Sequence, residues 1–149
     1  MRIAADSCVI VKWFKGGEGS QEEALRLRDD VLSGSLSLIV SEWVYLEVIR
    51  GLSKVSYPRD KVSKAGKVLM EMADLGFLDV VPISSVLEES MNLIMDLNLY
   101  ASDAVTLASA LIKRVDLLSE DRHLLKDRVR EAASERGIRI LSLKEFYGE

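Results

Sequence analysis

Four acidic residues have the side chains and the positions to hold a divalent cation: Asp6, Glu47, Asp103 and Asp121. Mg²⁺ takes oxygen ligands, usually one or two carboxylates together with water molecules. Such an ion can activate a water molecule and stabilise the charge that develops on a phosphate as a phosphodiester bond breaks. Carboxylates that lie together without a cation repel one another, so stability gives no reason to cluster them. If the fold brings the four acids together, they indicate metal-assisted hydrolysis.

The segments around these acids must supply the elements that position them. Five short apolar runs predict buried strands, and the second and third are rich enough in Val, Ile and Leu to be covered on both faces. The predicted strands span residues 3–5, 36–40, 78–82, 115–118 and 138–141. Longer amphipathic stretches predict helices over about 20–32, 41–55, 58–76, 85–97, 101–114 and 121–136. Ser20 with Glu23, and Ser85 with Glu88, have the spacing of capping boxes at helix starts.

The alternation of strands with helices predicts the fold class. It favours parallel pairing with helices on both faces, so we expect a three-layer α/β/α sandwich around a mostly parallel five-stranded sheet. We find no linker, and expect one domain over residues 1–149. In open parallel sheets, ligands bind at the carboxyl ends of the strands. Asp6 and Asp121 follow predicted strands, whereas Asp103 begins a helix and Glu47 lies about one and a half turns into another.

Four short motifs surround the acids. The first is Asp6-Ser7 with the apolar segment that follows it; the second is Leu46-Glu47-Val48 followed by Gly51-Leu52; the third is Asp103-Ala104 with Ala108 and Ala110; the fourth is Leu117-Leu118-Ser119-Glu120-Asp121-Arg122. Their order and spacing resemble the PIN-domain family, in particular the branch that includes VapC toxins, over essentially the whole chain. Two positions depart from the pattern: Ser41 stands near where relatives often have Pro, and Ser102 stands where an aromatic residue is frequent. Neither removes an acid.

The resemblance implies an activity. It implies an endoribonuclease in which Asp6, Glu47, Asp103 and Asp121 hold Mg²⁺ or Mn²⁺, directly or through water, and RNA is hydrolysed to leave a free 3′-hydroxyl. Ser7 and Ser119 would provide hydroxyls that hydrogen-bond the carboxylates or the phosphate. It also implies the toxin of a VapBC-type toxin–antitoxin pair, a homodimer, and a small antitoxin protein that blocks the acidic site. A PIN nuclease of RNA processing or decay without an antitoxin remains an alternative, as does a non-catalytic module that binds RNA or protein.

Each acid also has an interpretation that involves no metal. Asp103 could favour the positive end of a helix dipole, and Asp121 could cap the helix that follows it. Glu47 shares a helix face with Arg50 and Lys54, so it could be an exposed ion-pair partner. The case for the metal site therefore rests on the four motifs jointly.

The single cysteine and the single histidine favour no other enzyme class. Cys8 alternates with apolar neighbours, which predicts a small buried side chain. We expect His123 on a helix surface. One Cys and one His exclude the usual zinc sites.

A basic segment between Arg50 and Lys67 contrasts with the net charge of −4. Its six cations are Arg50, Lys54, Arg59, Lys61, Lys64 and Lys67, against one acid, Asp60. Such a segment could follow an RNA backbone. It could equally be a solvated helical hairpin, or meet an acidic partner protein.

Composition sets the remaining bounds. The 149 residues are 48% hydrophobic and 30% charged, which is typical of a globular protein. No apolar run approaches the roughly 20 residues of a membrane span, and the N-terminus has no secretory signal, so we expect a cytoplasmic protein. One cysteine allows no disulfide within the chain and fits a reducing compartment. The few Asn, Gln and Cys residues are a slight indication of a thermophilic source.

Overall fold

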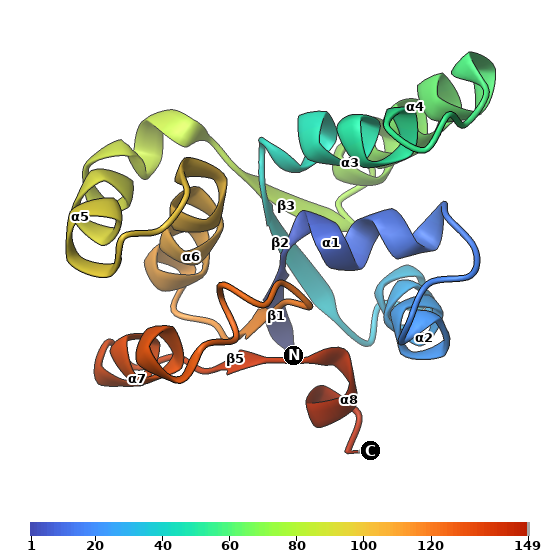
Figure 1. Cartoon of the computed structure of the whole chain (residues 1–149). Coiled ribbons are helices and arrows are strands. Elements are labelled where there is room, and N and C mark those ends of the chain that lie inside the picture. The colour runs from blue at the N-terminus through green and yellow to red at the C-terminus, as the bar shows by residue number, and fades with distance from the viewer. Residues whose placement is uncertain (149) are drawn as a thin grey trace.

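The protein is built around a five-stranded sheet in which every neighbouring pair of strands is parallel (Figure 1). The computed structural model describes residues 1–148. The strands are β1 (Arg2–Ala5), β2 (Ser37–Ser41), β3 (Leu78–Val81), β4 (Leu117–Leu118) and β5 (Ile140–Leu141). They lie in the order β3-β2-β1-β4-β5. The predicted sheet is confirmed, and all of its strands are parallel.

Helices cover both faces of the sheet, which makes the predicted α/β/α sandwich. One face carries α1 (Ser7–Ile10), the 3₁₀ turn η1 (Val11–Trp13), α2 (Gln21–Leu32), α3 (Val44–Ser53) and α4 (Arg59–Asp74). The other carries the turn η2 (Ile83–Ser85), α5 (Leu87–Leu97), α6 (Ala101–Lys113) and α7 (Asp127–Glu135), and α8 (Leu143–Phe146) closes the described chain. Figure 1 shows these two groups of helices on opposite sides of the strands.

Alternating side chains of the central strands fill two separate cores. In β1, Ile3 and Ala5 pack against α1–α4, whereas Ala4 faces α5–α7. In β2, Leu38 and Ile39 divide in the same way. Because successive side chains of a strand point to opposite faces, a strand covered on both sides must be apolar throughout. This is why the apolar runs of the sequence identified the strands.

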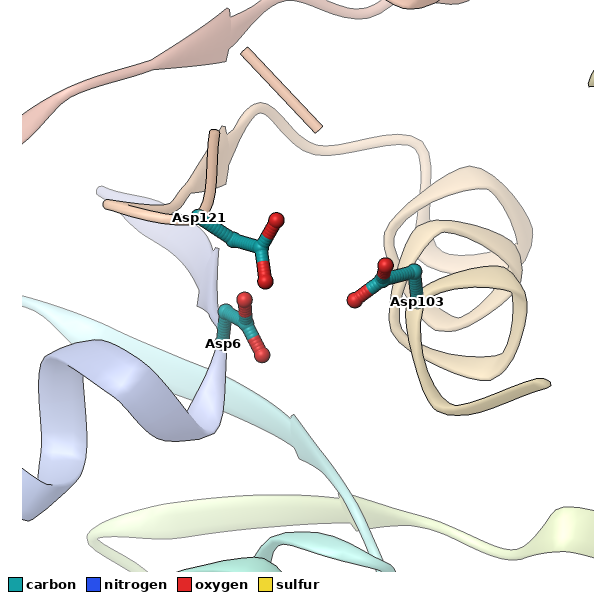
Figure 2. A group of neighbouring side chains, drawn as sticks. All are labelled: Asp6, Asp103 and Asp121. Carbon is teal, nitrogen blue, oxygen red and sulfur yellow. The ribbon is translucent and has the colours of Figure 1, made fainter. Parts of the chain in front are cut away.

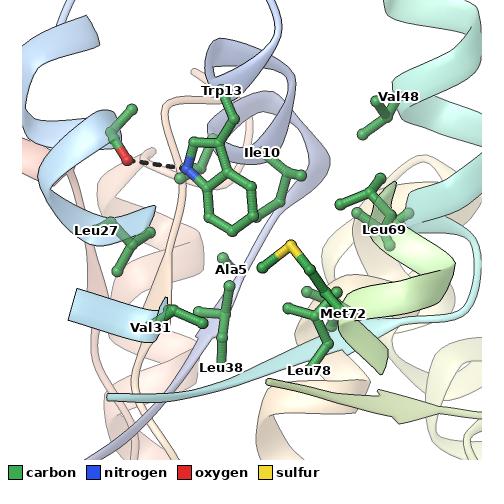
Figure 3. Packing of buried hydrophobic residues seen from close by; sticks show 14 of the residues in the cluster. Ala5, Ile10, Trp13, Leu27, Val31, Leu38, Val48, Leu69, Met72 and Leu78 are labelled. Carbon is green, nitrogen blue, oxygen red and sulfur yellow. Dashed lines mark hydrogen bonds between the residues drawn. The ribbon is translucent and has the colours of Figure 1, made fainter. Parts of the chain in front are cut away.

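Trp13 fixes the segment that follows β1 against α2. Its indole Nε1 donates a hydrogen bond to the Ala24 carbonyl at 2.9 Å, and its ring packs beside Ile10 and Leu27 (Figure 3). The bonded indole can be buried without leaving a polar atom unsatisfied. The segment formed by α1 and η1 is thereby held against α2.

Several predicted helix caps, and one predicted helix start, are wrong. Ser20 adopts a left-handed backbone (φ 56°) and its side chain caps nothing, and the predicted box at Ser85 falls in η2, ahead of α5. The Ser41 hydroxyl accepts from the Trp43 N–H at 3.1 Å, in the turn before α3, and so does not cap that helix. The last long helix begins at Asp127, not at Asp121. For Ser41, Ser85 and Asp121, hydrogen bonds within the turn before the helix replaced the expected cap.

The strand order places the carboxyl ends of β1 and β4 side by side. β1 pairs with β2 on one of its sides and with β4 on the other, so the direction in which the sheet is built up reverses at β1. In open parallel sheets, ligands are expected at such a point, in the crevice outside the carboxyl ends of β1 and β4. α6 ends just before β4 and runs back along the sheet, so its first turn lies at the same edge (Figure 1).

Within residues 1–148, no helix is both long and apolar enough to cross a bilayer.

Candidate metal centre

Three carboxylates meet at the carboxyl edge of the sheet. Asp6 directly follows β1, Asp121 follows β4, and Asp103 lies in the first turn of α6. One oxygen atom of each lies within 4.8 Å of those of the other two, and Figure 2 shows the three side chains pointing toward a common space. The tertiary structure therefore brings together three of the four predicted acids.

Asp6 is held by several hydrogen bonds. Its Oδ1 accepts from the backbone N–H of Ser7 at 2.7 Å, which caps α1. Its Oδ2 accepts from the Ser119 hydroxyl at 3.0 Å and from the Cys8 thiol at 3.2 Å. Burial raises the pKa of Asp6 above its ordinary value, and these hydrogen bonds oppose that rise. Asp6 thus stabilises the local fold as well as contributing to the acidic group.

Asp103 is buried beside other acids without compensation. It is 6% exposed, and within residues 1–148 its carboxylate makes no hydrogen bond or ion pair. Burial, then the charges of Asp121 and Asp6, raise the pKa of Asp103 from 3.8 to about 7. The position near the N-terminus of α6 favours a negative charge, which acts against the effects of burial and repulsion. A bound cation would supply the missing compensation.

Asp121 organises a turn and does not cap a helix. Its Oδ1 accepts from the His123 N–H at 2.6 Å, whereas the N-cap of α7 is Lys126. Its own N–H donates to the Ser119 hydroxyl at 3.0 Å, and Ser119 in turn donates to Asp6. Ser119 therefore joins the acids that follow β1 and β4. The predicted placement of His123 on a helix surface is wrong, because this residue lies in the turn.

Glu47 lies near the three aspartates but outside the group defined by 4.8 Å. Burial, followed by the charges of Asp6 and Asp103, raises the pKa of Glu47 from 4.5 to about 7, and a hydrogen bond with Ser7 opposes the rise. Among residues 1–148, no ion pair joins Glu47 to Arg50 or Lys54. The interpretation of Glu47 as half of an exposed ion pair is therefore not supported. Its electrostatic environment is that of the acidic group.

Gly51 allows α3 to approach the N-terminal segment closely. A Cβ atom at this position would lie 3.1 Å from Cγ2 of Val11 in η1. Such a contact is tighter than ordinary van der Waals packing, so a larger residue would require the Val11 side chain to shift. Because Glu47 lies one turn earlier on α3, the glycine also helps to set its distance from Asp6.

Cys8 takes part in the acidic group, which sequence reasoning missed. Its thiol donates to Asp6 Oδ2 and accepts from the backbone N–H of Glu120, both at 3.2 Å. Burial and the charge of Asp6 raise the pKa of Cys8 well above its ordinary value, so the thiol remains a donor. The thiol is partly buried against the core, close to what was expected, and it also makes these two polar contacts. The missed signal is its position two residues after Asp6, on the same side of the short helix start.

Replacing Cys8 tests this contact. Cys8→Ala removes both the donor to Asp6 and the acceptor for Glu120, and should weaken Mg²⁺ or Mn²⁺ binding about tenfold or more, as loss of a group that orients a ligand commonly does. Cys8→Ser keeps a donor and an acceptor and should retain most of the affinity. Titration calorimetry with Mn²⁺ would measure both variants. Equal affinities for Cys8→Ala and the parent would contradict the role.

A groove with a volume of about 690 Å³ opens beside Glu47. It lies between η1 and α3, and its walls carry Glu47 as well as several positively charged side chains. The charged and polar side chains that line it are Ser7, Lys12, Lys15, Glu18, Glu47, Arg50, Lys54 and Glu120. Lys12 is buried and donates to the Gly19 carbonyl at 2.7 Å, so it holds the loop before α2.

The structure divides the predicted basic segment into separate surfaces. Arg50 and Lys54, on and just after α3, line the groove that contains Glu47. Lys61 and Lys64, on α4, line a different pocket beside Tyr57. Arg59 and Lys67 are exposed elsewhere on α4. Only the first pair shares a cavity with one of the acids.

Comparison with known families identifies the fold. A profile of the PIN domain family matches residues 3–131, a range that includes all four acids. The chain belongs to the PIN domain family. The resemblance of its four motifs is thereby confirmed, and so is the predicted fold. Comparison with curated protein sequences gave no match.

Solved structures with the PIN fold resemble the chain along nearly its whole length. A toxin–antitoxin complex from Klebsiella pneumoniae is 16% identical with a TM-score of 0.63, over 95% of this chain and 97% of that chain. VapBC2 from Rickettsia felis, bound to a promoter DNA fragment, is 14% identical with a TM-score of 0.64, over 95% and 98%. PAE2754 from Pyrobaculum aerophilum is 16% identical with a TM-score of 0.61, over 98% and 92%. At these identities the likeness establishes the shared fold.

Proposed function

We propose that this PIN domain protein is a metal-dependent endoribonuclease and the toxin of a toxin–antitoxin pair. The observation that carries the proposal is the group formed by Asp6, Asp103 and Asp121, with Glu47 beside it, at the carboxyl edge of the sheet. Repulsion within such a group costs stability, which a purely structural role does not explain. Metal-assisted cleavage of a phosphodiester bond gives the group a chemical purpose.

Mg²⁺ or Mn²⁺ fits this donor set. The three aspartates offer only carboxylate oxygens, the ligands that hard cations prefer. Asp103, buried and without a compensating partner within residues 1–148, is the strongest indication that a cation belongs here. Asp6, Asp103 and Asp121 would hold the ion, with Glu47 acting directly or through water. When bound, the ion supplies charge stabilisation for the phosphate and lowers the pKa of a water molecule.

Residues of the chain orient these acids and the substrate. Ser119 donates to Asp6 and accepts from the Asp121 N–H, which links the Asp6 carboxylate to the backbone of Asp121. Ser7 and Cys8 hydrogen-bond the acids on the side of the groove. Arg50 and Lys54 provide positive charge along that groove, where a phosphate backbone would lie. RNA is therefore the substrate class that we assign to the site.

An antitoxin is the partner that we infer. The chain has the fold of a protein solved as a toxin–antitoxin complex in Klebsiella pneumoniae, which supports this inference. The alternative within the enzyme class is a PIN nuclease of RNA processing or decay that has no antitoxin. A reading frame directly upstream that encodes a small DNA-binding protein would favour the toxin. The strained acidic group disfavours a non-catalytic module, because such a module gains nothing from it.

Expression of the chain alone, followed by incubation with total cellular RNA, tests the activity. We expect cleavage with Mg²⁺ or Mn²⁺, no cleavage with excess EDTA, and products that carry a free 3′-hydroxyl. Mapping the ends by sequencing would identify the cleaved sites. Intact RNA with either metal would contradict the proposal.

The two basic surfaces allow a matched test of the RNA path. Arg50→Gln with Lys54→Gln should weaken RNA binding and reduce the log–log salt dependence by about 1.4, since each lost contact to a single strand contributes about 0.7. Lys61→Gln with Lys64→Gln removes the same charge from the other pocket and should leave the slope unchanged. Fluorescence anisotropy at several salt concentrations would measure both. A reduced slope only in the second pair would place the RNA on α4.

A further inference from the structure

Tyr100 is an aromatic side chain that the fold leaves open to solvent. It is 68% exposed, and among the Phe, Trp and Tyr residues within residues 1–148 it alone is exposed. The others are buried or partly buried against the two cores. An exposed ring of this kind contributes little to the core, yet it offers a large, rigid and amphipathic contact area.

The ring lies at the same edge of the sheet as the acids. Tyr100 is the N-cap of α6, three residues before Asp103, and its carbonyl accepts from the Ala104 N–H at 3.0 Å. His123 lies two residues after Asp121 and donates its N–H to that carboxylate. Both aromatic residues are therefore attached to segments that carry acids of the metal centre.

Tyr100 and His123 support each other. Their ring centroids are 5.3 Å apart and their planes make an angle of 76°, an edge-to-face contact. The contact restrains the tyrosine ring while most of its surface stays accessible. Both rings line a small hollow together with Lys126 and Arg128, and the Arg128 guanidinium donates to the Leu97 carbonyl. Lys126 is exposed and adds a positive charge beside the rings.

We propose that Tyr100, restrained by His123, is a stacking platform for a nucleobase of single-stranded RNA next to the cleaved phosphate. Unpaired bases stack on aromatic side chains, and this contact tolerates any base because every base has a π-face. Lys126 is placed to contact a neighbouring phosphate. The groove with Arg50 and Lys54 lies on the Glu47 side of the acids, so the substrate would be held on both sides of the cleaved bond. The assignment rests on the proposed ribonuclease function and extends it to a base-binding subsite.

The test combines a change in the protein with a change in the RNA. Binding is measured by anisotropy in an Asp103→Asn background with EDTA, so that cleavage does not enter the result. The probes are a single-stranded oligoribonucleotide and a set of copies that each lack one base. Tyr100→Ala should weaken binding of the intact RNA by about five- to 150-fold, the range of one stacked base. Tyr100→Phe keeps the ring and should bind like the parent.

The RNA that lacks the stacked base should bind Tyr100→Ala and the parent equally, since the missing contact is the same. Leu75→Ala, which removes an equally exposed apolar side chain (66%) just before β3 at the opposite edge of the sheet, should change nothing. The proposal would be overturned if Tyr100→Ala bound the intact RNA like the parent. It would also be overturned if Tyr100→Ala weakened the binding of every base-lacking RNA by the same factor. Failure of the parent to cleave RNA would instead contradict the proposed function, and these binding results do not depend on cleavage.

Discussion

Asp103→Asn should lower the rate of RNA cleavage by about two orders of magnitude or more while the protein stays folded. The change keeps the volume of the side chain and removes a ligand charge from the group with Asp6 and Asp121. A loss of about 3 kcal/mol of transition-state stabilisation corresponds to a factor of about a hundred in rate, and a bound cation typically contributes several kcal/mol. Initial rates at saturating Mg²⁺ would measure the effect.

Two further variants and a control complete this experiment. Asp6→Asn should also lose activity, but Asp6 accepts hydrogen bonds from Ser7, Cys8 and Ser119, so its melting temperature must be measured alongside. Glu47→Gln should lower the rate of RNA cleavage about tenfold, which is the smaller effect expected of an acid that acts through water. Asp60→Asn, an exposed acid on α4, should cut like the parent. Parent-like cleavage by Asp103→Asn would show that the metal centre is assigned incorrectly.

Without metal, the same Asp103→Asn protein should be more stable than the parent at pH 8. Asp103 is buried, and its neighbours in the group are carboxylates. The amide removes one charge from the cluster and can donate to the remaining carboxylates. We expect the melting temperature with EDTA to rise by about 3 °C or more, which for a protein of this size corresponds to about 1 kcal/mol.

The pH dependence of the metal-free parent follows from the same carboxylates. In the folded protein the pKa of Asp103 and that of Glu47 are raised to about 7, from 3.8 and 4.5. Between about pH 4 and pH 7 the folded state therefore binds more protons than the unfolded chain, so stability falls as the pH rises through this window and is level above it. Because a pKa difference of one corresponds to about 1.4 kcal/mol, the loss should be several kcal/mol, lessened by the water that reaches Glu47. Asp103→Asn should show a smaller fall, and its advantage should vanish near pH 4.

Added Mg²⁺ should stabilise the parent much more than Asp103→Asn. An ion that binds only the folded state stabilises it by about 1.4 kcal/mol at ten times its Kd, and the parent should gain this while Asp103→Asn gains much less. Melting curves with EDTA and with excess Mg²⁺ would measure all four states. If Asp103→Asn destabilises the metal-free protein by about 1 kcal/mol or more, Asp103 stabilises the first turn of α6 and does not belong to a metal centre.

The strands and the acids were predictable because their signals are local. Strands buried on both faces need continuous apolar runs, and helices between them need an apolar stripe, so the alternation specified an α/β/α sandwich. The four motifs placed Asp6, Glu47, Asp103 and Asp121 with respect to these elements before any contact was known. Helix caps were less predictable, because Ser20, Ser41 and Ser85 all precede helices but none caps one.

Only the tertiary structure decided which groups meet. The strand order β3-β2-β1-β4-β5 brings Asp6 beside Asp121 across 115 positions of the chain, and α6 adds Asp103 at the same edge. The hydrogen bond from the Glu120 N–H to the Cys8 thiol depends on the loop after β4, which no local pattern could place. The same holds for the separation of Arg50 and Lys54 from Lys61 and Lys64, since it follows from how α3 and α4 pack. The sequence determined the elements and the acidic side chains through short-range periodicity and side-chain chemistry. Distances, burial and the raised pKa values arise from packing between segments far apart in the chain, and so required the fold itself.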